Sequence, residues 1–277
     1  MSKYYVWLDA GHSKATGGKR NEKANPKFYE YEFNNDIAVK LKARLEAHGI
    51  TVYLTNTTPN GADIALTTRA NTANTKWSSL GKPSNAIFVS IHGNASTGAW
   101  ANARGVEVYH ANNASSKSKN LASLLTKQIY EDIKKVDSGF KQRGVKSANF
   151  TVIYKASMPS VLIEHGFYDN KKDLALMQNK RSVFVEADCK AICKYFGITY
   201  KAPTAVNENF QIKVIYEGKE GLNIREQPNT TSKIKGQIYY NEVYTIVEVQ
   251  GNWGLLKSYA KNKNGWINLS SKYVMKR

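Results

Sequence analysis

Short apolar runs alternate with longer amphipathic stretches over residues 1 to 198. The apolar runs are rich in β-branched and aromatic residues and stop abruptly at small polar residues, which is typical of buried strands. The stretches between them place apolar residues on one helical face, as Ile37, Leu41 and Leu45 illustrate. This alternation predicts an α/β fold with a mostly parallel, twisted sheet flanked by helices.

The predicted elements follow from where each pattern starts and stops. One helix begins near Glu30 and ends at Gly49, after a polar loop over Ser13–Lys27. Further helices are expected at about 65–77, around 121–129 and at 181–195. The expected strands lie at 6–10, 51–55, 87–92, 105–109, 150–154 and 159–164.

The pattern changes near Gly197. Residues 199–209 contain a proline and small residues without periodicity, which predicts a linker. From Phe210 onward the sequence indicates only short strands and turns. We therefore expect an α/β domain at 1–198, a linker at 199–209 and a small all-β barrel at 210–277.

Charge narrows the choice of partners. The 277 residues include 40 Lys and Arg against 22 Asp and Glu, a net charge of +18, which attracts polyanions. The basic residues are scattered and form no nucleic-acid readout motif, so we expect anionic cell-wall polymers and not nucleic acid. The longest apolar stretches fall far short of the roughly 18 residues that span a bilayer, and no membrane insertion is expected. The N-terminus lacks a signal-peptide pattern, which predicts synthesis in the cytoplasm.

The two cysteines, Cys189 and Cys193, lie one helical turn apart. A redox or metal pair is the alternative, but the sequence has no second cysteine pair and no histidine near them. We interpret both as buried structural thiols.

Three of the apolar runs end in residues with metal or acid–base chemistry. His12 follows the first strand, His92 ends the run from Ile87, and Glu164 ends the run from Pro159. The carboxyl ends of parallel strands meet at one edge of a sheet, where α/β folds build their sites. Imidazoles and a carboxylate suit a hydrolytic zinc ion that keeps one position open for water. The sequence therefore predicts a metal-dependent hydrolase.

A third metal ligand is expected from the first predicted helix, where Glu30, Glu32 and Asp36 are candidates. Glu30 and Glu32 point about 200° apart around a helix, so spacing alone leaves the choice open. Asn34 lies one turn after Glu30 and is placed to orient its carboxylate, which modestly favours Glu30.

Five motifs occur in a fixed order along the first domain: Asp9–His12, Glu30–Asn34, Arg69 with Asn74, Ser90–Ala95 and Pro159–Phe167. In this order they resemble the zinc-dependent N-acetylmuramoyl-L-alanine amidases of the amidase_3 type, over nearly the whole domain. The resemblance implies that His12, Glu30 and His92 bind Zn2+ and that Glu164 is the catalytic carboxylate. It also implies cleavage of the amide bond between N-acetylmuramic acid and L-alanine in peptidoglycan.

Two further residues of these motifs are candidate substrate contacts, Asn94 and His165. His165 departs from the small residue that the family often has after its catalytic glutamate. A supporting position behind the site is the favoured alternative for His165. Arg69 and Asn74 are expected to hold loops.

The second domain resembles a bacterial SH3-like domain, through Leu222–Arg225 and Gly265–Ile267. This implies binding to cell-wall peptidoglycan or its peptides. Tyr240, Tyr244 and Trp253 are candidate wall-binding aromatics, whereas Trp266 is expected in the core.

We therefore expect a monomeric peptidoglycan hydrolase of the phage endolysin kind, which acts on the wall after release from the host cytoplasm. A bacterial autolysin or sporulation-associated amidase is the alternative with the same chemistry. An inactive wall-binding protein is the alternative from another class, and the presence of His12, His92 and Glu164 argues against it.

Overall fold

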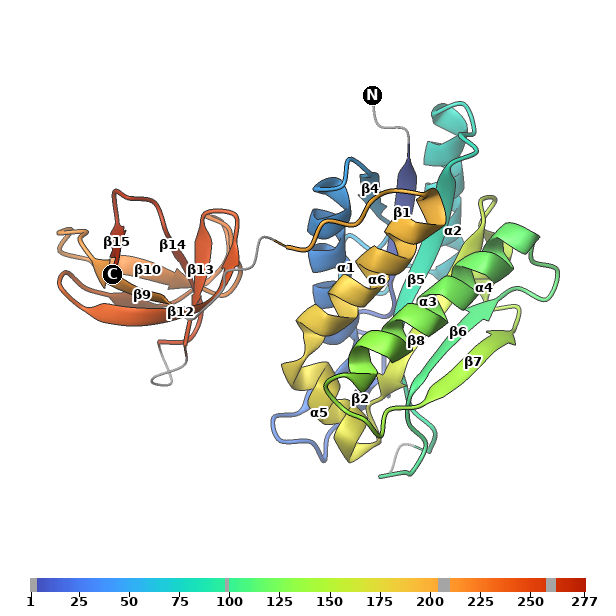
Figure 1. Ribbon diagram of the computed structural model, residues 1–277, viewed down its shortest axis with the longest axis horizontal. Helices are drawn as coiled ribbons and strands as arrows, with labels where there is room; N and C mark the ends of the chain where they lie inside the picture. The colour runs from blue at the N-terminus through green and yellow to red at the C-terminus, as the bar shows by residue number, and fades with distance from the viewer. Residues whose placement is uncertain (1–3, 98–99, 204–209, 258–262) are drawn as a thin grey trace. The chain divides into compact units, whose positions relative to one another are not determined.

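A computed structural model describes residues 4–97, 100–203, 210–257 and 263–277 (Figure 1). The chain divides into two compact units, Met1–Ala202 and Pro203–Arg277, which are taken separately below. Most of the linker predicted at 199–209 lies outside the described residues, since these omit 204–209.

A six-stranded sheet in the order β4-β1-β5-β8-β6-β7 forms the centre of the first unit. Its strands are β1 (Tyr5–Ala10), β4 (Thr51–Leu54), β5 (Ala86–Asn94), β6 (Val106–His110), β7 (Gln142–Ser147) and β8 (Ser160–Phe167). All neighbouring pairs are parallel except β6 and β8, which are antiparallel. The mostly parallel sheet predicted from the sequence is confirmed.

Helices cover both faces of this sheet. One face carries α1 (Glu30–Glu46), α3 (Ser116–Lys134) and α6 (Arg181–Phe196), which lie side by side in Figure 1. Their apolar sides pack on the larger core, to which Leu41, Leu125 and Ile192 belong. The other face carries α2 (Leu66–Ser79) and α4 (Thr151–Lys155) over a smaller core around Trp7 and Phe88. None of the described helices is long and apolar enough to cross a membrane.

One predicted strand is wrong. The strand expected at 150–154 is replaced by the short helix α4 (Thr151–Lys155), whose Val152 and Ile153 are buried in the smaller core. β-Branched and aromatic residues favour a strand locally, but packing on a sheet face overrides so weak a preference. The sheet edge beside β6 is instead taken by β7, which the sequence analysis missed because its residues are mostly exposed.

Three more short elements were also missed: the hairpin strands β2 (Arg20–Asn21) and β3 (Phe28–Tyr29), and helix α5 (Lys171–Asn179). β2 and β3 lie in or beside the loop expected at Ser13–Lys27, and each has only two residues. α5 begins at Asn170, whose side chain accepts hydrogen bonds from the main-chain N–H groups of Lys172 and Asp173. Such a cap is the one sequence signal that marks this helix.

The second unit contains a seven-stranded sheet in which all neighbouring strands are antiparallel. Every helix or strand described within 210–257 and 263–277 is a strand, as predicted: β9 (Phe210–Val214), β10 (Leu222–Arg225), β11 (Ile234–Ile238), β12 (Val243–Gln250), β13 (Trp253–Leu256), β14 (Trp266–Asn268) and β15 (Val274–Lys276). Alternate residues such as Ile212, Ile224 and Ile246 point into a common core. Trp266 is buried, as expected.

Candidate functional site

Three parallel strands bring the predicted site residues to one edge of the first sheet. His12 follows β1, His92 lies near the end of β5, and Glu164 lies in β8. The register pairs His92 directly with Glu164, so the two side chains project from the same face of neighbouring strands. Register alone therefore places a metal-ligand type beside a carboxylate.

His12, Glu30 and His92 form a tight group, in which one ligand atom from each lies within 4.8 Å of the others. Glu30 Oε1 lies 3.4 Å from His12 Nε2 and 3.1 Å from His92 Nδ1. Two imidazoles and one carboxylate are the donor set of many hydrolytic zinc sites. The group fits a zinc ion with one position left for water.

The structure settles which acidic residue of α1 joins the two histidines. Glu30 is the first residue of the helix and is buried against the sheet edge. Glu32 is exposed and accepts a hydrogen bond from Tyr31, whereas Asp36 pairs with Lys40. Neither of these two carboxylates belongs to the group at the sheet edge.

The protonation states in this group also suit a cation. Burial by itself raises the pKa of Glu30, but hydrogen bonds and charge from the two histidines outweigh it and lower the pKa to about 2. Burial lowers the pKa of His92 below its usual value. Glu30 is thus ionised and His92 is neutral near pH 7, as metal coordination requires.

The backbone beside His12 permits this close approach. Gly11 lies so near the His92 ring that an added Cβ would sit 2.1 Å from a ring carbon. His12 has a positive φ of 64°, a conformation that non-glycine residues rarely adopt and that often occurs at functional sites. Asn56 stabilises the turn, because its Nδ2 donates to the carbonyls of Ala10 and His12.

A layer of buried polar contacts holds the group from behind. Asn34 Nδ2 donates to Glu30 Oε1 and to the carbonyl of Gly11. Asp9 lies beside Ser90 and pairs with the buried Arg69, which ties β1 and β5 to α2. The side chain of Asn74 donates to the carbonyl of Lys155 and accepts from the N–H of Ser157, which is consistent with the loop-holding function expected for Asn74 and Arg69.

Glu164 has a different environment from Glu30. Its Oε2 is shielded from solvent and has no hydrogen-bond partner among the described residues. Burial raises its pKa well above the usual range, and the negative charges of Glu30 and Glu107 add to the effect. A carboxylate whose charged form is so poorly stabilised binds a proton readily, which suits general acid–base chemistry near neutral pH.

The two predicted substrate contacts differ in outcome. Asn94 is partly buried, and its Nδ2 donates to Glu107 Oε1 at 2.6 Å. His165 is fully buried, which favours the supporting position over the predicted substrate contact. Its Nε2 lies 2.9 Å from Asp188 Oδ2 and its Nδ1 lies 3.3 Å from the carbonyl oxygen of His92, which makes it a support behind β5 and β8.

The sequence analysis missed a charged cluster next to Glu164. Glu107 is buried in β6 and is paired with Glu164 across the sheet. Its carboxylate accepts hydrogen bonds from Asn94, from Arg143 and from Lys146. The only sequence signal for this cluster is one acidic residue inside the apolar strand Val106–His110. It does not identify the basic partners, which come from another strand.

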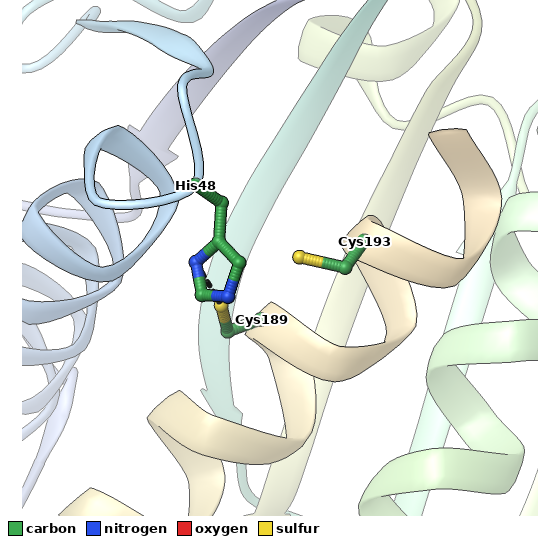
Figure 2. A group of neighbouring side chains, drawn as sticks. All are labelled: His48, Cys189 and Cys193. Carbon is green, nitrogen blue, oxygen red and sulfur yellow. Dashed lines mark hydrogen bonds between the residues drawn. The ribbon is translucent and has the colours of Figure 1, made fainter. Parts of the chain in front are cut away.

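A second group of metal-ligand types lies elsewhere in the first unit. Cys189 and Cys193 project from one side of α6 towards His48 at the end of α1, as Figure 2 shows. The sequence analysis missed this histidine because 141 residues separate it from Cys189. Both ring nitrogens of His48 already have backbone partners, since Nε2 accepts from the N–H of Lys201 and Nδ1 lies 2.7 Å from the carbonyl oxygen of Arg44.

One thiol of this second group is also a poor metal ligand as it stands. A hydrogen bond with Cys193 and burial raise the pKa of the Cys189 thiol, whereas a metal requires the thiolate. The contacts therefore favour buried structural thiols packed against a hydrogen-bonded histidine.

The candidate aromatics of the second unit are separated by their burial. Tyr240 is 49% exposed, whereas Tyr244 is buried in the core and its hydroxyl donates to Glu242. These contacts favour a core position for Tyr244 over a place in a surface groove. Trp253 lines a cavity of about 190 Å³ with Tyr216, Arg225 and Tyr273. Such a concave site with aromatic and polar lining suits a small ligand.

Comparison with protein families yields two matches. Residues 6–194 match the model described as N-acetylmuramoyl-L-alanine amidase, and residues 220–275 match that of the bacterial SH3 domain. The first match contains every site residue discussed above for the first unit, and the second contains the cavity lined by Trp253, apart from Tyr216.

Individual relatives agree with these matches. An endolysin of Bacillus phage SPP1 is 30% identical over 99% of this chain and 98% of its own length. The N-acetylmuramoyl-L-alanine amidase LytC of Bacillus subtilis is 30% identical over 68% of this chain, which spans 34% of that protein. Among solved structures, an N-acetylmuramoyl-L-alanine amidase from Clostridium difficile 630 aligns with a TM-score of 0.61 and 28% identity, over 71% of this chain and 98% of its own.

Proposed function

The chain belongs to the N-acetylmuramoyl-L-alanine amidase family, and on this premise we propose that His12, Glu30 and His92 hold a zinc ion beside the catalytic Glu164. The chain is a peptidoglycan hydrolase that cleaves the amide bond between N-acetylmuramic acid and L-alanine. The chain is similar to a phage endolysin over nearly its whole length, which supports the biological role of an endolysin.

The geometry of Glu30 is the observation that carries the metal proposal. Its buried carboxylate lies between two imidazoles, and Oε2 of the nearby Glu164 has no hydrogen-bond partner among the described residues. The family is generally zinc-dependent. Zinc at such a site polarises the scissile carbonyl and lowers the pKa of a water molecule towards about 7.

Glu164 performs the proton transfers in this proposal. Its free Oε2 accepts a proton from the attacking water, and the raised pKa allows the carboxyl to keep that proton until it is needed. The alanine nitrogen then receives the proton as the carbon–nitrogen bond breaks. Without this step the leaving group would be an amide anion, which is a very poor leaving group.

The second unit supplies wall binding in this proposal. The match to the bacterial SH3 domain and the net charge of +18 support attraction to peptidoglycan with its anionic polymers. Exposed Tyr240 and the cavity lined by Trp253 are the proposed contacts. We propose domains at 1–198 and 210–277, and action of a monomer on the wall after release from the host cytoplasm.

Digestion of purified walls by the full chain tests the proposal. We expect bound zinc and a steady release of new N-terminal alanine. Glu164→Gln should keep its zinc and lose about 10²–10⁴-fold in rate, the usual contribution of a general acid–base group. Loss of zinc from Glu164→Gln would make Glu164 a ligand and would contradict the assignment of roles.

A further inference from the structure

A row of paired residues crosses the sheet from the metal group to the far edge. His92 on β5 is paired with Glu164 on β8, Glu164 with Glu107 on β6, and Glu107 with Gly144 on β7. Directly paired residues project from the same face of a sheet. Because neighbouring strands lie about 4.8 Å apart, Glu107 is about 10 Å from His92 along this row and β7 about 15 Å.

Two cations lie at the end of this row. Arg143 Nε donates to Glu107 Oε2 at 2.8 Å, and the Lys146 ammonium donates to the same oxygen. The guanidinium carbon of Arg143 is also 4.8 Å from the centre of the Phe167 ring, three residues after Glu164 on β8. Arg143 therefore extends from β7 back towards the catalytic edge.

This cluster retains capacity for a ligand. Glu107 neutralises one of the two cations, which leaves a net charge of +1. The side chains of Arg143 and Lys146 are 34% and 36% exposed, whereas that of Glu107 is 3% exposed. Among the described residues, Arg143 makes hydrogen bonds only through Nε, so its two terminal nitrogens are available for the paired hydrogen bonds that guanidinium makes with a carboxylate.

We propose that Arg143 and Lys146, held by Glu107, bind a free carboxylate of the substrate peptide close to its first residue, L-alanine. This inference rests on the proposed function and adds a specificity site to it. An extended peptide advances about 3.4 Å per residue, so the second residue beyond the scissile bond lies about 7 Å away. A carboxylate on that residue reaches the cluster if the peptide runs along the row.

The chemistry of the peptide supplies such a group. Where the second residue is glutamate linked to the chain through its side-chain carboxyl, its main-chain carboxylate is left free. Conversion of that group to an amide removes the charge while the shape is nearly unchanged. We therefore expect the enzyme to distinguish walls by this single modification.

Two disaccharide tetrapeptides that differ only in this group, free acid or amide, test the inference. For the unmodified full chain we expect kcat/KM to be about five- to tenfold higher for the acid, because a partly exposed charge-assisted contact contributes near the low end of its range. Arg143→Gln and Lys146→Met should bring the ratio close to one. Arg143→Lys keeps the charge without the paired donors and should retain part of the preference.

Lys127→Met is the matched control, since it removes an exposed cation of α3 whose ion-pair partner is Glu131. It should leave the acid-to-amide ratio and the thermal midpoint unchanged, and all variants should keep their zinc. A ratio near one for the unmodified chain, or an unchanged ratio in both cluster variants, contradicts the inference. If neither peptide is cleaved, the proposed function is contradicted as well.

Anionic wall polymers carry phosphate, which is the other source of such an oxyanion. Walls stripped of these polymers separate the two sources. If the cluster variants are impaired only on walls that retain the polymers, and not on the soluble pair, the peptide assignment is wrong and the cluster binds polymer phosphate.

Discussion

Glu164 and Glu107 are directly paired on the antiparallel strands β8 and β6, yet their carboxylates have opposite surroundings. Glu107 accepts hydrogen bonds from four side chains, whereas Glu164 Oε2 accepts none from the described residues. Burial raises both pKa values, but the cations beside Glu107 bring its pKa below the usual range. The pKa of Glu164 stays well above that range. The pairing of β6 with β8 thus places a permanently ionised carboxylate, Glu107, beside a carboxylate that binds a proton readily, Glu164.

The first prediction concerns pH. Glu164 must be ionised to accept a proton, so its raised pKa places the acid limb of the pH–rate profile above pH 4.5. Glu107→Gln removes a like charge that raises this pKa, and the acid limb should move to lower pH. Lys19→Met removes a cation that lowers the pKa and should move the limb to higher pH. Kinetics of kcat/KM against pH measure both shifts, and Glu131→Gln on α3 should produce neither.

The second prediction separates the acidic residues of α1. Glu30→Gln should lower zinc affinity strongly, because it removes the only carboxylate of the group. Glu32→Gln is the matched control, since Glu32 lies two residues away and is exposed. Competition with a coloured chelator measures both affinities. Equal zinc affinity in the two variants would contradict the ligand assignment.

The third prediction concerns the number of metal ions. We expect one zinc per chain. In the second group, formed by His48, Cys189 and Cys193, both ring nitrogens of His48 already have backbone hydrogen-bond partners and are not free to bind a metal. Replacement of both Cys189 and Cys193 by alanine should leave the zinc content unchanged. Two zinc ions per chain in the unmodified protein, falling to one in this variant, would show that the thiols bind metal.

The fourth prediction concerns the buried pair behind the site. His165→Ala leaves Asp188 buried without its partner, which should cost about 3–5 kcal/mol of stability. Replacement of both residues by apolar side chains of similar size should cost less, because no charge is then left unpaired. Hydrogen exchange of the β8 amides reports both changes. A larger cost for the double variant would show that the pair itself stabilises the fold.

The fifth prediction concerns the second unit. Residues up to Glu208 carry 29 basic and 17 acidic side chains, or +12, so removal of residues 210–277 leaves a strongly basic enzyme. Its lysis of cells should be slower, because tethering at the wall is lost. The remaining attraction is long-range and screened by salt, so the truncated chain should be the more salt-sensitive form. Equal rates for both forms at every ionic strength would show that the second unit does not target that wall.

The sequence by itself determined the class of fold and which candidate site residues meet at one edge of the sheet. The apolar runs that end in His12, His92 and Glu164 predict strands whose ends share one edge, because parallel strands in one sheet point the same way. The run at 150–154 was misassigned, since a five-residue apolar segment fits a strand and a packed short helix equally well. Only the packing of Val152 and Ile153 on the sheet distinguishes the two.

Tertiary structure alone decided the contacts that tune the chemistry. Spacing alone leaves Glu30 and Glu32 open as ligands, and Asn34 only modestly favours Glu30. The docking of α1 on the sheet is what places Glu30 between the imidazoles. Glu107 meets Arg143 and Lys146 because β7 pairs with β6. Glu107 lies beside Glu164 because β6 also pairs with β8, and no local pattern encodes either pairing. Side-chain periodicity reports which face of an element is buried. The partner across that face depends on strand order and register, which are properties of the whole chain.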